Sequence, residues 1–125
     1  MRWIILAVGL ALVASAARAD LERSDFMAES VGAIYDLCTA DESTSDGKYA
    51  IGYCYGWIVG VGQVYEQLLI DERFDLDPVI CSKTELTWQD VRATFVAWAE
   101  ANPKALGEPA LSGIFDAMEE QYPCK

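Results

Sequence analysis

The 125-residue chain contains no histidine. A Ser-His-Asp or Cys-His catalytic centre therefore cannot be assembled from its own side chains. A GxSxG nucleophile elbow is also absent. The carboxylates gather in segments that we expect to be exposed loops and helix faces, so no pair stands out for hydrolytic acid-base work. We therefore expect a binding protein without catalytic residues or a cofactor.

Patterns that bind metals or phosphates are missing as well. None of the cysteine spacings resembles CxxC, and a zinc site without histidine would need all four cysteines. The acidic segment TADESTSDGK, residues 39–48, fails the EF-hand pattern because Gly47 falls one place late and no glutamate ends the loop. The glycine-rich segment further on is not followed by Lys-Ser or Lys-Thr, which excludes a P-loop. We expect no metal site.

Basic residues are scarce, with nine Lys and Arg against 20 Asp and Glu, for a net charge of −11. Loss of Arg2 and Arg18 with an N-terminal leader would leave a net charge of −13. Such a charge repels nucleic acids and anionic membranes and steers the protein towards basic partners. The same charge would also keep an exported protein in solution. Composition alone does not decide between attraction of a basic partner and solubility.

The N-terminus has the pattern of a secretory signal peptide. Met1-Arg2 precedes an uncharged apolar run over residues 3–13, and Ala17-Arg18-Ala19 is a small-x-small cleavage site. The run is shorter than the about 20 residues that a transmembrane helix needs. No cysteine follows the cleavage site, which argues against a lipoprotein. We expect residues 1–19 to be removed on export to the periplasm, leaving residues 20–125 as one small domain.

Four cysteines in an exported domain of this size predict two disulfides. They are Cys38, Cys54, Cys81 and Cys124. Counting alone leaves three pairings open.

Apolar residues recur at helical intervals in four segments. The first is capped by Ser24 or Asp25 and ends near Cys38, and the second covers about residues 49–70. The third begins after Thr87 and stops at Asn102-Pro103, and the fourth has Pro109 in its first turn. The apolar faces comprise Phe26, Met27, Val31 and Ile34 in the first segment, Trp88, Val91, Phe95 and Trp98 in the third, and Leu111, Ile114, Phe115, Met118 and Tyr122 in the fourth. No strand pattern appears, so the sequence predicts an all-α, four-helix domain stapled by disulfides.

The stretch IGYCYGWIVGVG, residues 51–62, raises the question of what its glycines do, because each lowers helix stability by roughly 1 kcal/mol relative to alanine. Gly52, Gly56 and Gly60 lie four residues apart and share one side of a helix. We expect them to let a neighbouring helix pack closely. A membrane helix pair is the alternative, although Gln63 and Glu66 interrupt the apolar run. A homodimer across an exposed part of the same groove is a further interpretation.

The segment DERFDLDPVICSKTEL, residues 71–86, is predicted to be a long loop, because Pro78 disfavours a helix. Asp71, Glu72, Asp75 and Asp77 make it strongly acidic. Long loops in small domains are often functional, while a solvated connector is the plainer interpretation.

Several short motifs together resemble a known family. GYCYGWIVG, a cysteine shortly before LTWQDV, then NPKAL and a terminal YPC occur in that order between Phe26 and Cys124. This order resembles the Rap/Tai family of periplasmic immunity proteins associated with type VI secretion. The resemblance implies a helical, disulfide-bonded protein that inhibits a secreted effector, often a peptidoglycan amidase, by occupying its active-site cleft.

Within that resemblance, the cysteines are expected to pair as Cys38–Cys54 and Cys81–Cys124. Such binding asks for a protruding polar segment, and the two acidic segments, residues 39–48 and 71–77, are the candidates. The expected partner-binding segment is Asp71 to Asp77, through Asp71, Glu72, Asp75 and Asp77, because its length and charge suit insertion into a basic cleft. Two other functions remain as hypotheses, a periplasmic acid-stress chaperone and a non-catalytic subunit of an envelope complex. Strong acid would change the net charge of the mature chain from −13 to about +7, which could loosen the fold of a chaperone and expose apolar surface.

Overall fold

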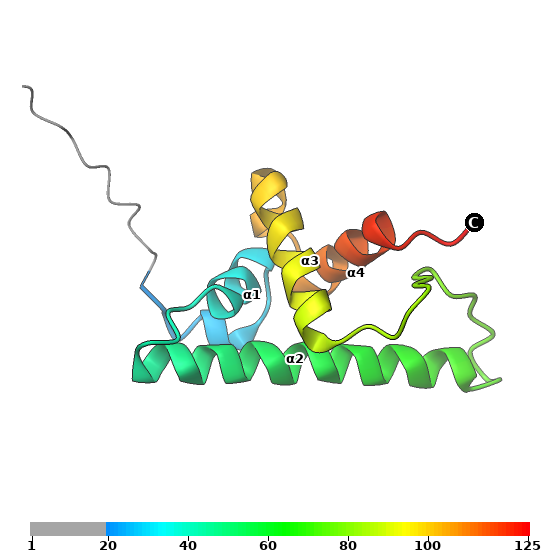
Figure 1. Ribbon diagram of the computed structural model, residues 1–125, viewed down its shortest axis with the longest axis horizontal. Coiled ribbons are helices and arrows are strands. Elements are labelled where there is room, and N and C mark those ends of the chain that lie inside the picture. The colour runs from blue at the N-terminus through cyan, green and yellow to red at the C-terminus, as the bar shows by residue number, and fades with distance from the viewer. Residues whose placement is uncertain (1–19) are drawn as a thin grey trace, which may run out of the picture.

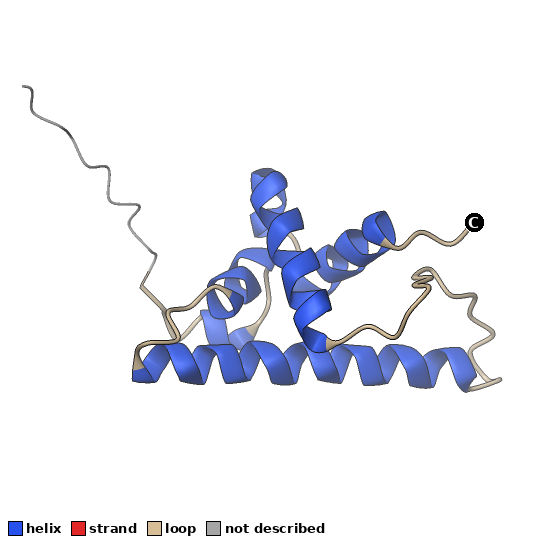
Figure 2. Cartoon of the chain, in the orientation of Figure 1, coloured by secondary structure: helices blue, strands red, loops and turns tan. Residues whose placement is uncertain are grey.

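The computed structural model describes residues 20–125, so the predicted signal peptide lies outside the described residues. The described chain is all-α, with four α-helices, two short 3-10 helices and no strand (Figure 2). The elements are η1 (Asp25–Met27), α1 (Val31–Cys38), α2 (Ser45–Ile70), α3 (Trp88–Ala101), η2 (Pro103–Gly107) and α4 (Ala110–Gln121). The predicted four-helix fold is confirmed. None of the helices in this part of the chain is long and apolar enough to cross a membrane.

The short helix α1 lies at the centre of the fold. It contacts α2, α3 and α4, and all three of those helices are longer. The 26-residue α2 forms one edge of the molecule, and the other helices all lie on the same side of it (Figure 1). The fully buried side chains of the core include Val31, Ile34, Leu37, Cys38, Cys54 and Phe95. Half of α1 is therefore buried, and its packing partners come from the rest of the chain.

The first helix begins later than the sequence predicts. Residues 25–27 form only a 3-10 turn, because Ala28 adopts a left-handed conformation with φ of 54°. Ser30 then caps α1, and its Oγ accepts a hydrogen bond from the backbone N–H of Ala33 at 3.1 Å. Phe26 still packs on the core through the rings of Tyr49 and Tyr53, whereas Met27 is exposed.

The second helix begins one turn earlier than predicted. Thr44 caps it, since its Oγ1 accepts a hydrogen bond from the N–H of Gly47 at 2.9 Å. A Cβ atom at Gly47 would collide with the carbonyl group of Asp41. Only glycine therefore fits this close approach between the preceding loop and the first turn of α2.

The starts of the last two helices lie close to the prediction. Thr87 and Asp90 form a reciprocal capping box at the start of α3. Asn102 ends that helix, as expected. Pro109 occupies the cap position of α4, one place before the first turn in which it was expected.

The expected packing role of Gly52, Gly56 and Gly60 is wrong for the described part of the chain. A Cβ atom built at any of them meets nothing within 4 Å. The reason is rotational. Cys54 and Ile58 are buried on the inner face of α2, and residues two places from Cys54 lie about 200° around the helix. The three glycines therefore lie on the outer side of the helix.

Close approach occurs instead at other glycines. At Gly113 in α4, a Cβ atom would collide with the side chain of Val31 and crowd the ring of Trp98. At Gly32 in α1, it would lie 3.1 Å from the carbonyl oxygen of Leu106. These positions let α1 approach α4 and η2.

Paired glycine substitutions test this arrangement. Gly113→Ala should destabilise the protein by about 1–3 kcal/mol, because the methyl group overpacks the contact between α4 and Val31. Gly56→Ala should stabilise it by about 0.5–1 kcal/mol, because the methyl group meets open space and alanine favours a helix. Urea unfolding of the oxidised, dilute protein measures both. A loss of stability in Gly56→Ala would show that the outer face of α2 is covered.

Candidate functional site

The segment of residues 71–80, here called the acidic loop, leaves the end of α2 and turns back towards the C-terminal end of the chain (Figure 1). Its path then continues through residues 81–87 to the start of α3. Two sets of contacts hold its beginning and its end, and the residues between them are exposed.

The beginning of the acidic loop is held by Asp71. Its carboxylate accepts hydrogen bonds from the backbone N–H of Arg73 at 3.0 Å, from Arg73 Nε at 2.9 Å and from Nη2 at 2.5 Å. These bonds lower the pKa of Asp71 below its ordinary value. The pair is therefore present at neutral pH, and it is lost only as the pH falls through that lowered pKa. Asp71, one of four residues expected to bind a partner, is thus engaged within the chain.

The tip of the acidic loop carries the other three expected residues, Glu72, Asp75 and Asp77. All three are exposed, and no hydrogen bond or ion pair holds their carboxylates within residues 20–125. Asp75 adopts a left-handed conformation with φ of 45°, which aspartate tolerates better than most residues. Phe74 and Leu76 lie beside them and are about half exposed, at 48% and 50%. The tip therefore presents carboxylates and apolar side chains together.

The end of the acidic loop is fastened to α2 by Tyr65. The Tyr65 hydroxyl oxygen accepts hydrogen bonds from the backbone N–H groups of Val79 at 2.9 Å and Ile80 at 3.3 Å. The Tyr65 ring packs edge-on against Phe115 of α4, with 5.2 Å between the ring centroids. Tyr65 is not among the residues predicted from the sequence. Its spacing from Ile58 and Val61, at helical intervals on the inner side of α2, is the signal that indicates its position.

A disulfide joins Cys81, the residue that follows the acidic loop, to Cys124 near the end of the chain. Cys81 pairs with Cys124 at a Cα–Cα distance of 4.9 Å, and the Cys81 N–H donates to the carbonyl oxygen of Tyr122 at 2.8 Å. The chain-entropy argument assigns about 4 kcal/mol to a cross-link over 43 residues. The acidic loop is therefore tied to α2 through Tyr65 and to the chain end through Cys81.

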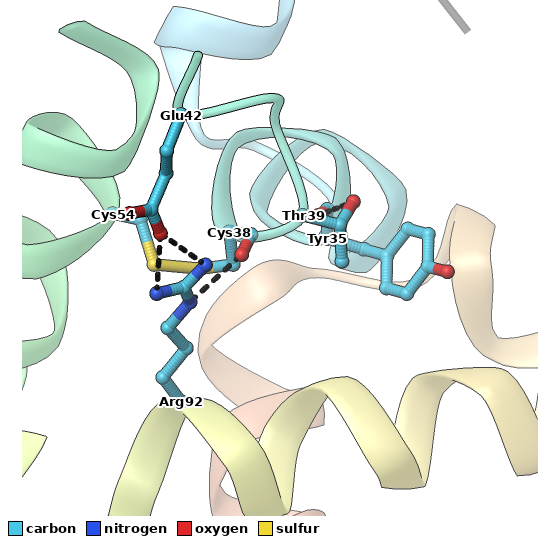
Figure 3. Close-up of a disulfide and its surroundings, with 6 residues drawn as sticks. All are labelled: Tyr35, Cys38, Thr39, Glu42, Cys54 and Arg92. Atoms are coloured by element: carbon cyan, nitrogen blue, oxygen red, sulfur yellow. Dashed lines mark hydrogen bonds and ion pairs between the residues drawn. A yellow bond between two sulfur atoms is a disulfide. The ribbon is translucent and has the colours of Figure 1, made fainter. Parts of the chain in front are cut away.

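The other disulfide joins Cys38 at the end of α1 to Cys54 in α2, with a Cα–Cα distance of 5.2 Å (Figure 3). Arg92 of α3 lies over it, donating from Nε to the carbonyl oxygen of Cys38 at 2.8 Å and from both terminal nitrogens to Glu42 at 3.2 Å. The two cysteine pairs are those that the family resemblance implies. Arg92 was missed, and its only sequence signal is its place one turn after Trp88, over whose ring its guanidinium lies.

Beside the acidic loop lies a cleft of about 330 Å³ between the second half of α2, residues 80–86, the start of α3, and α4. Its apolar lining consists of Ile58, Val61, Tyr65, Ile80, Leu86, Val91, Ile114, Phe115 and Met118. Its other lining residues are Gly62, Glu66, Ser82, Thr84 and Glu85. No lysine or arginine of the described residues lines it. The cleft is therefore an apolar recess edged by carboxylates.

Comparison with known proteins identifies the family. The chain matches the Rap1a immunity proteins over residues 30–124, and it belongs to that family. The match extends from the cap of α1 to the last cysteine and so includes both disulfides, the acidic loop and the cleft. No curated protein and no solved structure matches the chain. The family resemblance seen in the sequence is confirmed.

Removal of the Tyr65 hydroxyl tests how the acidic loop is held. Tyr65→Phe keeps the ring against Phe115 but deprives two backbone N–H groups of their acceptor, so hydrogen exchange at Val79 and Ile80 should accelerate. Global stability should fall by only about 1 kcal/mol. Tyr55→Phe is the matched control, since the Tyr55 ring packs on Trp88 and its hydroxyl makes no hydrogen bond in the described structure. Unchanged exchange at residues 79 and 80 would remove Tyr65 as the anchor.

Proposed function

We propose that this member of the Rap1a immunity protein family binds a secreted effector through the acidic loop and blocks the effector's active-site cleft. Family membership supports the effector as the partner. The observation that carries the proposal is the tip of the acidic loop, which is exposed, acidic and apolar and is held at both ends. An effector with a basic substrate cleft, such as a peptidoglycan amidase, is the partner that this chemistry fits.

The contacts that hold the loop explain how it could bind tightly. A segment that is already ordered loses less conformational entropy on association than a flexible one. Exposed Phe74 and Leu76 supply apolar side chains of the kind that act as anchors in interfaces. The carboxylates of Glu72, Asp75 and Asp77 would accelerate encounter with a basic cleft and fix the orientation of the complex.

The mode of action that we propose is binding alone, in the periplasm. Disulfides form and persist in oxidising compartments, so the pairs Cys38–Cys54 and Cys81–Cys124 fit an exported protein. The predicted signal peptide over residues 1–19 would direct that export. Inhibition would need no chemical step from this chain, because an inserted loop excludes substrate sterically.

Charge reversal of the loop tip tests the proposal. The triple variant Glu72→Lys/Asp75→Lys/Asp77→Lys should weaken effector binding by at least about 100-fold, because three attractive contacts become repulsive. Protection should be lost when the secreted protein encoded beside this one is co-expressed in the periplasm of a sensitive host. Calorimetry measures the affinity, and survival measures the protection.

The matched control reverses three exposed carboxylates outside the loop and the cleft, Glu108→Lys/Glu119→Lys/Glu120→Lys, and changes the net charge equally. It should retain protection and bind within a few-fold of the wild type. Equal losses in both variants would mean that overall charge rather than the loop mediates binding. Killing that proceeds equally with and without the wild-type protein would contradict the immunity function itself.

The homodimer expected from the glycine spacing is a further part of the proposal. Residues 49–65 of α2 contain no charged side chain, and Gly52, Gly56 and Gly60 lie on the outer face of this stretch. A second α2 could approach such a face closely, although the net charge of the chain opposes association elsewhere. Sedimentation should show a concentration-dependent dimer that Gly56→Gln converts to monomer, because the long side chain separates the helices. A wild-type protein that stays monomeric at high concentration would rule this out.

A further inference from the structure

We propose that the cleft beside the acidic loop is a second docking site, which receives an apolar side chain lying next to a lysine or arginine on the effector. The identification of the partner as the effector rests on the proposed function. The chemistry of the occupant is inferred from three features of the cleft: its apolar floor, its charged lining residues and its position beside the acidic loop.

The floor of the cleft is suited to one large apolar side chain. Ile58, Ile114 and Met118 are its most buried lining residues, each 3–4% exposed. The cleft volume of about 330 Å³ lies at the lower end of the range for ligand sites, which fits a side chain better than an extended cofactor. Filling it would desolvate apolar surface that neighbouring helices leave open.

The charged lining residues of the cleft select a cationic neighbour for that side chain. Glu66 and Glu85 are exposed, and the cleft lining within residues 20–125 contains no lysine or arginine, with Lys83 exposed in the adjoining turn. The segment between them is ordered by a small turn, in which Ser82 Oγ donates to the carbonyl oxygen of Thr84 at 2.7 Å. A lysine or arginine beside these carboxylates would be attracted, whereas a carboxylate would be repelled.

The cleft is continuous with the surface already proposed to bind the effector. Tyr65 and Ile80 line the cleft, and the same two residues form a hydrogen bond that fastens the end of the acidic loop. A partner that straddles the loop would therefore meet the cleft on its side. Two adjacent contacts on one partner would add binding energy and fix its orientation.

A second copy of this chain fits the cleft less well. Its exposed Phe74 lies beside Arg73, but that arginine already pairs with Asp71. The same segment carries Glu72 and Asp75, so it would bring more negative charge towards the carboxylates of the cleft. Charge complementarity therefore favours a basic segment of a different protein.

The first test uses short peptides and needs no effector. The blocked tripeptide Lys-Leu-Arg, titrated into the ¹⁵N-labelled protein, should shift the amide signals of Val61, Gly62 and Thr84 in a saturable manner. The blocked tripeptide Glu-Leu-Glu should not. Absent shifts, or equal shifts with both peptides, would overturn the assignment.

The matched variants use two glycines at which an added side chain has room. A Cβ atom meets nothing within 4 Å at either Gly62, which lines the cleft, or Gly107, which does not. Gly62→Leu should fill the mouth of the cleft and abolish the peptide shifts, and Gly107→Leu should preserve them. Circular dichroism confirms that both variants remain folded.

The second test uses the effector and separates this inference from the proposed function. Gly62→Leu should weaken effector binding by at least about tenfold, the scale of losing one anchor, while Gly107→Leu should not. Wild-type affinity in Gly62→Leu would overturn the cleft inference and leave the immunity proposal standing. A wild-type protein that binds the basic peptide but no effector would reject the immunity proposal and retain the selectivity of the cleft. If Gly62→Leu changed only the self-association seen by sedimentation and neither peptide nor effector binding, the cleft would be assigned to a second copy and our choice of occupant would be overturned.

Discussion

The cross-link between Cys38 and Cys54 is the constraint on which the fold depends. Helix α1 has only eight residues, too few for a stable isolated helix, yet the three longer helices pack around it. The disulfide holds the end of α1 against α2, and the cross-link over 16 residues is worth about 3 kcal/mol in the chain-entropy account. Arg92 brings α3 to the same point by donating to the carbonyl oxygen of Cys38. The central position of α1 is thus imposed covalently as well as by burial.

The second disulfide has a different consequence, because it acts on a loop instead of a helix. Cys81–Cys124 joins the end of the acidic loop to the end of the chain, and Tyr65 adds a tie to α2. The carboxylates at the loop tip repel one another, which would spread a flexible segment. The Tyr65 bonds and the disulfide limit such spreading, and residues 72–79 are exposed.

Much of the fold follows from local sequence, and the misses have physical causes. Thr87 and Asp90 locate the start of α3, because their capping box uses only neighbouring residues. The start of α1 was missed because Phe26 and Met27 continue the apolar spacing, while the left-handed backbone of Ala28 has no signature in its side chain. Gly52, Gly56 and Gly60 do not lie at a helix contact within the described residues, and the sequence contained the reason. Once Cys54 faces inward for its disulfide, Gly52 and Gly56 must face outward.

The sequence could locate the acidic loop, but it could not tell which of its residues are engaged within the chain and which are exposed. Composition and Pro78 indicate an acidic loop. The bonds that set Asp71 apart from Asp75 and Asp77 run to Arg73 and depend on the conformation of the turn. The cleft needed the tertiary structure, because its lining comes from α2, the following loop, α3 and α4. Tyr65 connects the acidic loop with the cleft. Its hydroxyl fixes the loop while its ring lines the cleft, so movement in either surface changes the support of the other. A partner that touches both would therefore meet one preformed surface rather than two independent patches.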